Sequence, residues 1–252
     1  MASRLGFIGT GNIASALVKG FCTAQDPPMK VMVSPRNPGK ASDLARKFSQ
    51  VAVAENNQAV IDSSDSVFLT IRPQAFETVI KNLFFRSEQT VICLVATMQM
   101  AKIRRFVEPA QTVVRALPLP PAAYHLGVIP FYPNVPQVFE ILDKIGKPLG
   151  LSEERELDLL WSLTALIAPF YDLMAQTSRW ATDRGVDSQT ANAYVASMFN
   201  ALSAMAVNAS ARGFSDLVAE AATPGGLNEQ ALHIIRTQSG HNPYLDALDA
   251  GL

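Results

Sequence analysis

The chain has 252 residues, of which 48% are hydrophobic and 17% charged, which is typical of one large or two modest folded domains. Its formal net charge of −1 gives no electrostatic reason to expect a nucleic acid or a membrane surface as partner. Cys22 and Cys93 lie in apolar runs, so we expect buried, reduced thiols of a cytoplasmic protein and no metal site. The stretch WSLTALIAPFYDLMAQ is interrupted by Pro169 and Asp172, so we expect no membrane-spanning helix.

The first half of the chain alternates short apolar runs with amphipathic stretches. The apolar runs predict strands at Leu5–Ile8, Lys30–Val33, Val67–Ile71, Val91–Val95 and, more weakly, Val113–Ala116. The amphipathic stretches predict helices at Asn12–Thr23, Pro38–Gln50, Gln74–Phe84 and Met100–Phe106. Regular alternation implies right-handed crossovers and a parallel sheet covered on both faces. We therefore predict a Rossmann-like, doubly wound α/β domain over residues 1–151.

The second half has no β-rich run and predicts helices only. Ser152 can cap a helix that extends to about Arg184, with a kink at Pro169. A second helix is predicted over Asp187–Arg212, and its surface is rich in Ala, Ser, Asn and Met, which suits close helix packing. The packing can be an intradomain bundle or a homodimer of interleaved helices, and we favour the homodimer because so apolar a surface needs a partner. Residues 152–252 are thus predicted to form an all-helical dimerisation and substrate domain.

A glycine motif follows the first predicted strand. Gly9, Gly11 and Ala14 form G-x-G-x-x-A between a strand and a helix, the context that a dinucleotide site requires. Asn12 and Ile13 belong to the helix N-terminus, where amide donors favour the pyrophosphate. A plain structural turn is the alternative, and we favour dinucleotide binding.

The end of the second predicted strand indicates which dinucleotide binds. An NAD site places an acid there to hold the ribose diol, but Ser34 takes that position, with Arg36, Asn37 and Lys40 just beyond. A hydroxyl and a guanidinium suit a 2′-phosphate, so we predict NADP. A solvated loop charge is the alternative for Arg36.

Five segments resemble the pyrroline-5-carboxylate reductase family in order and spacing: GFIGTGNIASALVKGF, ENNQAV…DSVFLTIRPQ, VVRALPLPP, LGVIPFY and TPGGLNEQALHII. The resemblance implies a dinucleotide domain joined to a helical domain that dimerises. It also implies NAD(P)H-dependent reduction of pyrroline-5-carboxylate to proline, as in proline biosynthesis. In that family Asn57 would contact the adenine ribose, although a turn residue is an equal alternative. Arg72 and Pro73 would lie at the carboxyl edge of the sheet, where such folds bind ligands, or form a structural turn.

The departures from the family pattern fall on the substrate side. Leu119 stands in place of the asparagine of M-P-N-T-P, and G-S-G-P-A-Y reads LIAPFY, without the serine and both glycines. In S-P-G-G-T-T, Thr223 keeps a hydroxyl, while Leu227 and Asn228 replace the two threonines. The resemblance implies that Asn228 inherits the contact with the ring nitrogen. We therefore expect a changed, more apolar substrate pocket.

The segment Thr223–Asn228, called here the TPGG loop, is the predicted substrate site. Gly225 and Gly226 precede a helix, where their amides can hold a carboxylate. Thr223 and Asn228 are the candidate catalytic contacts, Leu227 and Pro118 are candidate substrate contacts, and Pro118 is expected near the nicotinamide. The alternative is a plain helix cap, with Asn228 as N-cap of a helix over Glu229–Gln238. Tyr124 and His125 are further candidates for the pocket rim. We expect Tyr171 to be a core or interface aromatic and His233 to be a packed side chain.

Three functions compete. Reduction of a cyclic imine needs little acid catalysis, because a pyrroline nitrogen arrives protonated, so the site need only orient it and exclude water. A β-hydroxyacid dehydrogenase shares the layout but needs a lysine base in its helical part, and no lysine follows Lys147. The third is a non-catalytic, NADP-binding dimeric sensor. We predict an NADPH-dependent cyclic-imine reductase, acting on pyrroline-5-carboxylate or a related imino acid.

Overall fold

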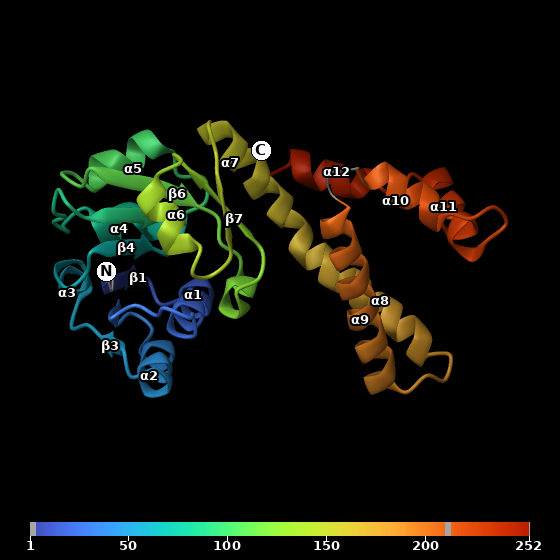
Figure 1. Ribbon diagram of the computed structural model, residues 1–252, viewed down its shortest axis with the longest axis horizontal. Coiled ribbons are helices and arrows are strands. Elements are labelled where there is room, and N and C mark those ends of the chain that lie inside the picture. Colours follow the sequence, from blue (N-terminus) through green and yellow to red (C-terminus); the bar gives the residue numbers. More distant parts are fainter. Residues whose placement is uncertain (1–3, 210–212, 252) are drawn as a thin grey trace. The chain divides into compact units, whose positions relative to one another are not determined.

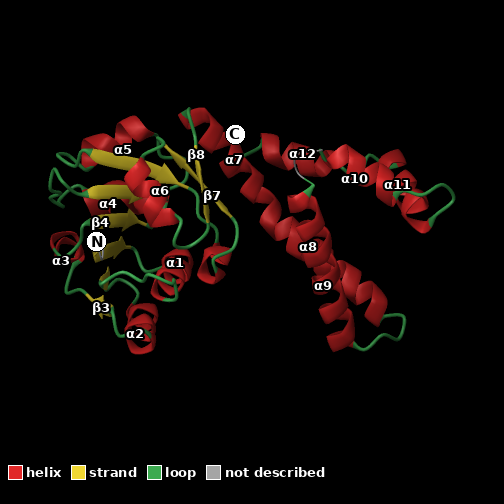
Figure 2. Ribbon diagram, in the orientation of Figure 1, coloured by secondary structure: helices red, strands yellow, loops and turns green. Residues whose placement is uncertain are grey.

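The computed structural model describes residues 4–209 and 213–251. The chain divides into two compact units, Met1–Trp161 and Ser162–Leu252. Among the described residues, the first unit carries every strand and the second is helical (Figure 1 and Figure 2). The fold class predicted from the sequence, a Rossmann-like sheet followed by a helical region, is confirmed. The division lies ten residues after the predicted join, and the roles assigned to the two domains remain predictions.

The first unit is built on one eight-stranded sheet, drawn in yellow in Figure 2. Its strands are β1 (Arg4–Ile8), β2 (Lys30–Val33), β3 (Val51–Val53), β4 (Ser66–Leu69), β5 (Thr90–Cys93), β6 (Thr112–Ala116), β7 (Val128–Tyr132) and β8 (Lys147–Gly150). Their order is β3-β2-β1-β4-β5-β6-β7-β8, and every neighbouring pair is parallel except β6 and β7. The chain therefore moves outward from β1 to β3 and then crosses to β4 on the other side of β1. In a doubly wound sheet, this reversal marks the ligand-binding crevice at the carboxyl ends of β1 and β4.

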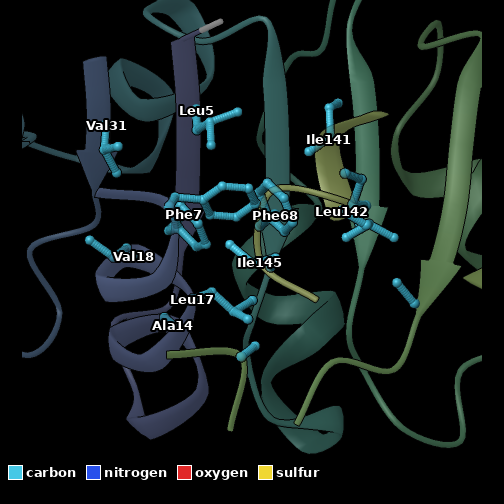
Figure 3. Close-up of a cluster of buried hydrophobic side chains, with 14 of the residues drawn as sticks. Leu5, Phe7, Ala14, Leu17, Val18, Val31, Phe68, Ile141, Leu142 and Ile145 are labelled. Atoms are coloured by element: carbon cyan, nitrogen blue, oxygen red, sulfur yellow. The ribbon is translucent and has the colours of Figure 1, made fainter. Parts of the chain in front are cut away.

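Helices cover both faces of the sheet. Successive side chains of a strand point to opposite faces, and here both sets are apolar and must be buried. Phe7 and Phe68 face one side, where their rings stack with centroids 4.7 Å apart (Figure 3). Leu17 of α1 (Asn12–Cys22) and Leu142 of α6 (Pro136–Leu142) close over them. The neighbouring strand residues Ile8, Val67 and Leu69 face the other side, with α3 (Asn57–Asp62), α4 (Phe76–Ile80) and α5 (Met100–Phe106).

Several predicted helices agree with the observed ones at their first residue. Helices α1, α2 (Pro38–Lys47) and α5 begin at the predicted residues, and α5 also ends at the predicted residue. The helix predicted over Gln74–Phe84 is wrong in its extent, because the chain forms a 3-10 turn, η1 (Pro73–Ala75), and then the short α4.

Three strands were not predicted: β3, β7 and β8. Strand β3 has only three residues, and β7 contains Pro130, which cannot donate a ladder hydrogen bond. The carbonyl of Pro130 nevertheless accepts from the amide of Leu117 at 2.9 Å, so the proline is tolerated beside β6. A second 3-10 turn, η2 (Pro120–Tyr124), connects β6 to β7.

Helix α7 (Glu154–Ser162) is attached to the sheet by a buried ion-pair cluster, which is why the first unit extends past residue 151. Arg115, at 1% exposure, donates to Glu154 at 2.6 Å and to Asp158 at 2.8 Å. The same Glu154 oxygen accepts from the amide of Met100 at 2.7 Å and so holds the start of α5. Leu157 is buried against Leu117.

The second unit contains the helices α8 (Ile167–Thr182), α9 (Ser188–Asn208), α10 (Phe214–Ala221), α11 (Leu227–Thr237) and α12 (Asn242–Asp249). The 3-10 turn η3 (Leu163–Leu166) precedes α8 and ends three residues before Pro169, where a kink was predicted. The missing N–H of Pro169 cannot bond the carbonyl four residues earlier. Helices α8 and α9 pack on each other, with the Ser178 hydroxyl donating to Asn192 at 2.6 Å. Of the helix predicted over Asp187–Arg212, residues 210–212 lie outside the described part.

Helices α8 and α9 expose large apolar side chains, among them Tyr171, Trp180, Tyr194 and Met205 at 60% exposure or more. Tyr171 was expected to be a core or interface aromatic; its exposure excludes the core position within this chain, and the interface position stays a prediction. By length and composition alone, Glu154–Thr182 is apolar enough to cross a membrane, which corrects the argument from Pro169 and Asp172. One such segment is weak evidence for a span, because helices that are buried in soluble proteins pass the same test.

Candidate functional site

The glycine motif forms the turn between β1 and α1. Gly9 has φ +99°, and a Cβ there would lie 2.7 Å from the carbonyl oxygen of Thr70, so both backbone conformation and space require glycine. Gly11 is the N-cap of α1, and a Cβ added to it would meet nothing within 4 Å. The space beside Gly11 is therefore open, at the end of α1 that carries free amides. This opening is compatible with the predicted pyrophosphate cradle, which stays a prediction.

Ser34 supports this turn from within. It is fully buried, and its hydroxyl accepts a hydrogen bond from the Gly9 amide at 2.9 Å. The Thr10 hydroxyl donates to the Ser34 carbonyl at 2.7 Å and fixes the same segment. The prediction that Ser34 presents its hydroxyl to a 2′-phosphate is therefore wrong for this conformation, because that hydroxyl is directed at the glycine turn.

Arg36 lies just after Ser34 and is exposed. Asn37 is the N-cap of α2 and its side-chain oxygen accepts from the Lys40 amide at 3.4 Å. The Lys40 ammonium in turn contacts the side-chain oxygen of Asn12 and links the first turns of α1 and α2. The Lys40 ammonium and the N-terminus of α2 thus lie beside the glycine turn, and Arg36 precedes them in the chain. A 2′-phosphate bound there would be neutralised. The Arg36 assignment remains a prediction with this geometry behind it.

The remaining cofactor candidates lie at the same edge of the sheet. Asn57 is the first residue of α3, whose N-cap is Asn56, so its interpretation as a plain turn residue is wrong. Arg72 is exposed, and Pro73 opens η1 four residues after the end of β4. Because β1 and β4 are neighbours, these loops and the glycine turn lie together at the topological switch point.

The loop after β5 contains a feature that the sequence did not indicate. Thr97 is exposed and has φ +63°, a left-handed conformation that is unusual for a β-branched residue. Strained residues of this kind gather at functional sites. Because β5 is parallel to β4, Thr97 follows the carboxyl edge on which the cofactor candidates lie, and it joins them as a candidate. Pro118, two residues past β6, is buried.

Two aromatic candidates for a pocket rim instead bind α1. The His125 ring nitrogen Nε2 lies 2.9 Å from the carbonyl oxygen of Gly20. The Lys19 ammonium lies 3.8 Å from the centroid of the Tyr124 ring, a cation–π contact. Both side chains hold η2 against α1, so a structural role is sufficient for them. His233, expected to be packed, is exposed in α11.

The TPGG loop lies between α10 and α11 and is exposed. Gly225 has φ +73°, and the Gly226 amide donates to the Thr223 carbonyl at 2.9 Å, which closes a tight turn. Helix α11 begins at Leu227 with Gly226 as its N-cap, so the prediction that Asn228 caps the helix is wrong. The Asn228 amide nitrogen instead donates back to the Ala221 carbonyl at 3.3 Å.

The predicted carboxylate site in this loop also needs correction. The Gly225 amide already donates to the Glu229 carboxylate at 2.7 Å. The Gly225 carbonyl accepts from the side chain of Gln230 at 3.2 Å. Both glycine amides are therefore satisfied within the loop, and Leu227, at 82% exposure, is the apolar group that it presents.

Comparisons with known proteins agree with this description. The family model described as "NADP oxidoreductase coenzyme F420-dependent" matches residues 4–97. Pyrroline-5-carboxylate reductase of Pseudomonas aeruginosa is 25% identical over 239 residues, which cover 91% of this chain and 87% of that protein. The enzyme of the same name from Methanosarcina acetivorans is 24% identical and covers 97% and 94%.

Solved structures show the same fold. The 1-pyrroline-5-carboxylate reductase of Streptococcus pyogenes has a TM-score of 0.82 at 24% identity, covering 99% of this chain and 96% of that one. The pyrroline carboxylate reductase of Plasmodium falciparum, solved with NADP bound, has a TM-score of 0.84 at 17% identity, covering 99% and 95%. Motifs, sequence relatives and fold agree, and over nearly its whole length the chain is similar to pyrroline-5-carboxylate reductases.

Proposed function

We propose that this protein is an NADPH-dependent oxidoreductase that reduces the C=N bond of a cyclic imine. The observation that carries the proposal is the glycine turn at the β1–β4 switch point, with Arg36 and Lys40 beside it. The relatives named above support both parts: they are pyrroline-5-carboxylate reductases, and the Plasmodium enzyme was solved with NADP bound. Pyrroline-5-carboxylate, reduced to proline, or a related imino acid is the substrate that these relatives favour.

The residues fit the nucleotide. The α1 amides after Gly11 would hold the pyrophosphate, and Arg36 with the start of α2 would hold the 2′-phosphate. Arg72 and Pro73 would border the nicotinamide. NADPH, when bound, supplies the hydride.

On the substrate side the protein has little chemistry to perform. A protonated imine accepts the hydride at carbon, the π electrons become the lone pair on nitrogen, and a neutral secondary amine results. The TPGG loop would orient the ring through Asn228, whose amide would have to turn from its bond to the Ala221 carbonyl. Leu227 would exclude water.

The helical unit would form a homodimer. Its support is the apolar surface of α8 and α9, which the described part of this chain leaves uncovered. We infer a small-molecule enzyme of the cytoplasm, with no nucleic-acid or membrane partner.

A non-catalytic, NADP-binding sensor is the second candidate. The observation that favours it is the TPGG loop, whose glycine amides are satisfied internally. A β-hydroxyacid dehydrogenase has less support, because no lysine follows Lys147.

Steady-state oxidation of NADPH separates the candidates. We expect turnover with at least one of pyrroline-5-carboxylate, pyrroline-2-carboxylate and larger cyclic imines. NADPH binding without turnover of any imine would favour the sensor, whereas reduction of NADP⁺ with a hydroxy acid would favour the dehydrogenase.

A further inference from the structure

The carboxylate that satisfies the TPGG loop belongs to the protein itself. Glu229 stands in the first turn of α11 and accepts from the Gly225 amide at 2.7 Å. A carboxylate at this position also suits the positive end of the helix dipole. The side chain of Gln230 donates to the carbonyl of the same residue, Gly225. The loop therefore needs no external anion to complete its hydrogen bonds.

A substrate carboxylate would meet two obstacles here. It would have to displace Glu229 from the Gly225 amide, and the displaced side chain, in the first turn of α11, would remain a like charge beside it. The Gly226 amide is no substitute, because it donates to the Thr223 carbonyl at 2.9 Å. The neighbouring group that the loop does offer is Leu227, which is apolar and 82% exposed.

A protonated imine without a carboxylate meets neither obstacle. Its iminium is a cation, which the Glu229 carboxylate attracts, and its ring is apolar, as Leu227 is. We propose, on the basis of the function proposed above, that Glu229 is a specificity-determining residue. It selects cyclic imines that carry no carboxylate, with pyrroline-5-carboxylate a poorer substrate.

The test compares kcat/KM for 2-methyl-1-pyrroline and for pyrroline-5-carboxylate in the full chain with NADPH. We expect the wild type to prefer 2-methyl-1-pyrroline by about tenfold or more, in keeping with one disfavoured charge contact. Glu229→Ala frees the Gly225 amide and removes the charge, so the preference should move toward pyrroline-5-carboxylate by about tenfold.

Two further variants make the result specific. Glu229→Gln keeps an oxygen that can accept from the Gly225 amide, preserves the loop and removes only the charge, so it should move the preference in the same direction by a smaller factor. Asp246→Asn removes an exposed acid from α12 and should leave the preference unchanged.

Each outcome decides the proposal. A wild type that prefers pyrroline-5-carboxylate, or active Glu229 variants whose preference equals that of the wild type, would overturn it and leave the imine reductase standing. If the wild type binds NADPH but reduces neither imine, the proposed function fails first and the inference with it. If Glu229→Ala does not fold, Glu229→Gln decides alone.

Discussion

Replacement of Arg36 by alanine is the most direct test of the nucleotide assignment. Arg36 is exposed and lies between the buried Ser34 and Asn37, the N-cap of α2. Its side chain makes none of the hydrogen bonds and ion pairs described here, so replacement by alanine should leave the fold unchanged. The side chain is placed where a 2′-phosphate would also meet the positive end of α2.

The size of the effect follows from the contact that would be lost. A hydrogen bond to a charged group contributes about 1.5–3 kcal/mol, and solvent screening of an exposed arginine favours the lower part of that range. We therefore expect Arg36→Ala to raise the Kd of NADPH about 10- to 100-fold. The Kd of NADH, which lacks the phosphate, should barely move. Nicotinamide fluorescence titrations at low and high salt measure both, and salt should shrink the NADPH difference.

A matched control is available on the same helix. Arg46, at 73% side-chain exposure, lies in the last turn of α2 and pairs with Asp43 at 2.6 Å. Arg46→Ala removes the same charge from the far end of α2 and should leave both affinities unchanged. Equal losses for NADPH and NADH in Arg36→Ala would refute the 2′-phosphate assignment.

Four other predictions follow from the structure. Asn228→Ala should lower kcat/KM on a cyclic imine about 10- to 100-fold, because the imine ring loses a group that orients it, and the Kd of NADPH should not change. Full activity of this variant would place the substrate elsewhere. Glu154→Gln leaves the buried Arg115 with a weakened partner, so it should lower the free energy of unfolding, measured in urea titrations, by about 2–4 kcal/mol. A change below measurement error would contradict the role of this ion pair in attaching α7 to the sheet. Burial raises the pKa of the Cys93 thiol to about 12, so it stays neutral at pH 8, and a thiol reagent should not react with it until the protein unfolds; Cys22, expected to be buried, is only partly buried and should react earlier. Sedimentation at micromolar concentration should show a homodimer, and a monomer would remove the proposed interface.

The sequence was sufficient for the parts of the fold that repeat a simple pattern. Strands β1, β2 and β4 to β6 each contain an apolar run bounded by turn residues, and α1, α2 and α5 begin at recognisable residues. Strand β7 was missed because Pro130 argues against a strand when ladder partners are unknown. Only the pairing with β6, a contact distant in sequence, explains why the proline is accepted.

The candidate site was predictable in its backbone and less so in its side chains. The requirement for glycine at position 9 was read from the motif, and the structure supplies the reason in the carbonyl of Thr70. The direction of the Ser34 hydroxyl and the bond between Glu229 and Gly225 depend on neighbours that a linear motif does not specify. The positive φ of Thr97 could not be predicted, because a threonine in a loop usually has a negative φ.

The divergence of this chain falls where its fold tolerates change. A Cβ at position 9 would clash with the backbone of Thr70, so this position in the predicted nucleotide-binding unit accepts only glycine. Leu227 and Asn228 stand in an exposed helix turn, where new side chains meet solvent and cost little stability. Imine reduction also permits the change, because the substrate brings its own proton and the loop need not supply an acid. A chain of this fold could therefore keep the hydride transfer while exchanging the groups proposed to hold the ring, and on our proposal Glu229 would make that exchange selective.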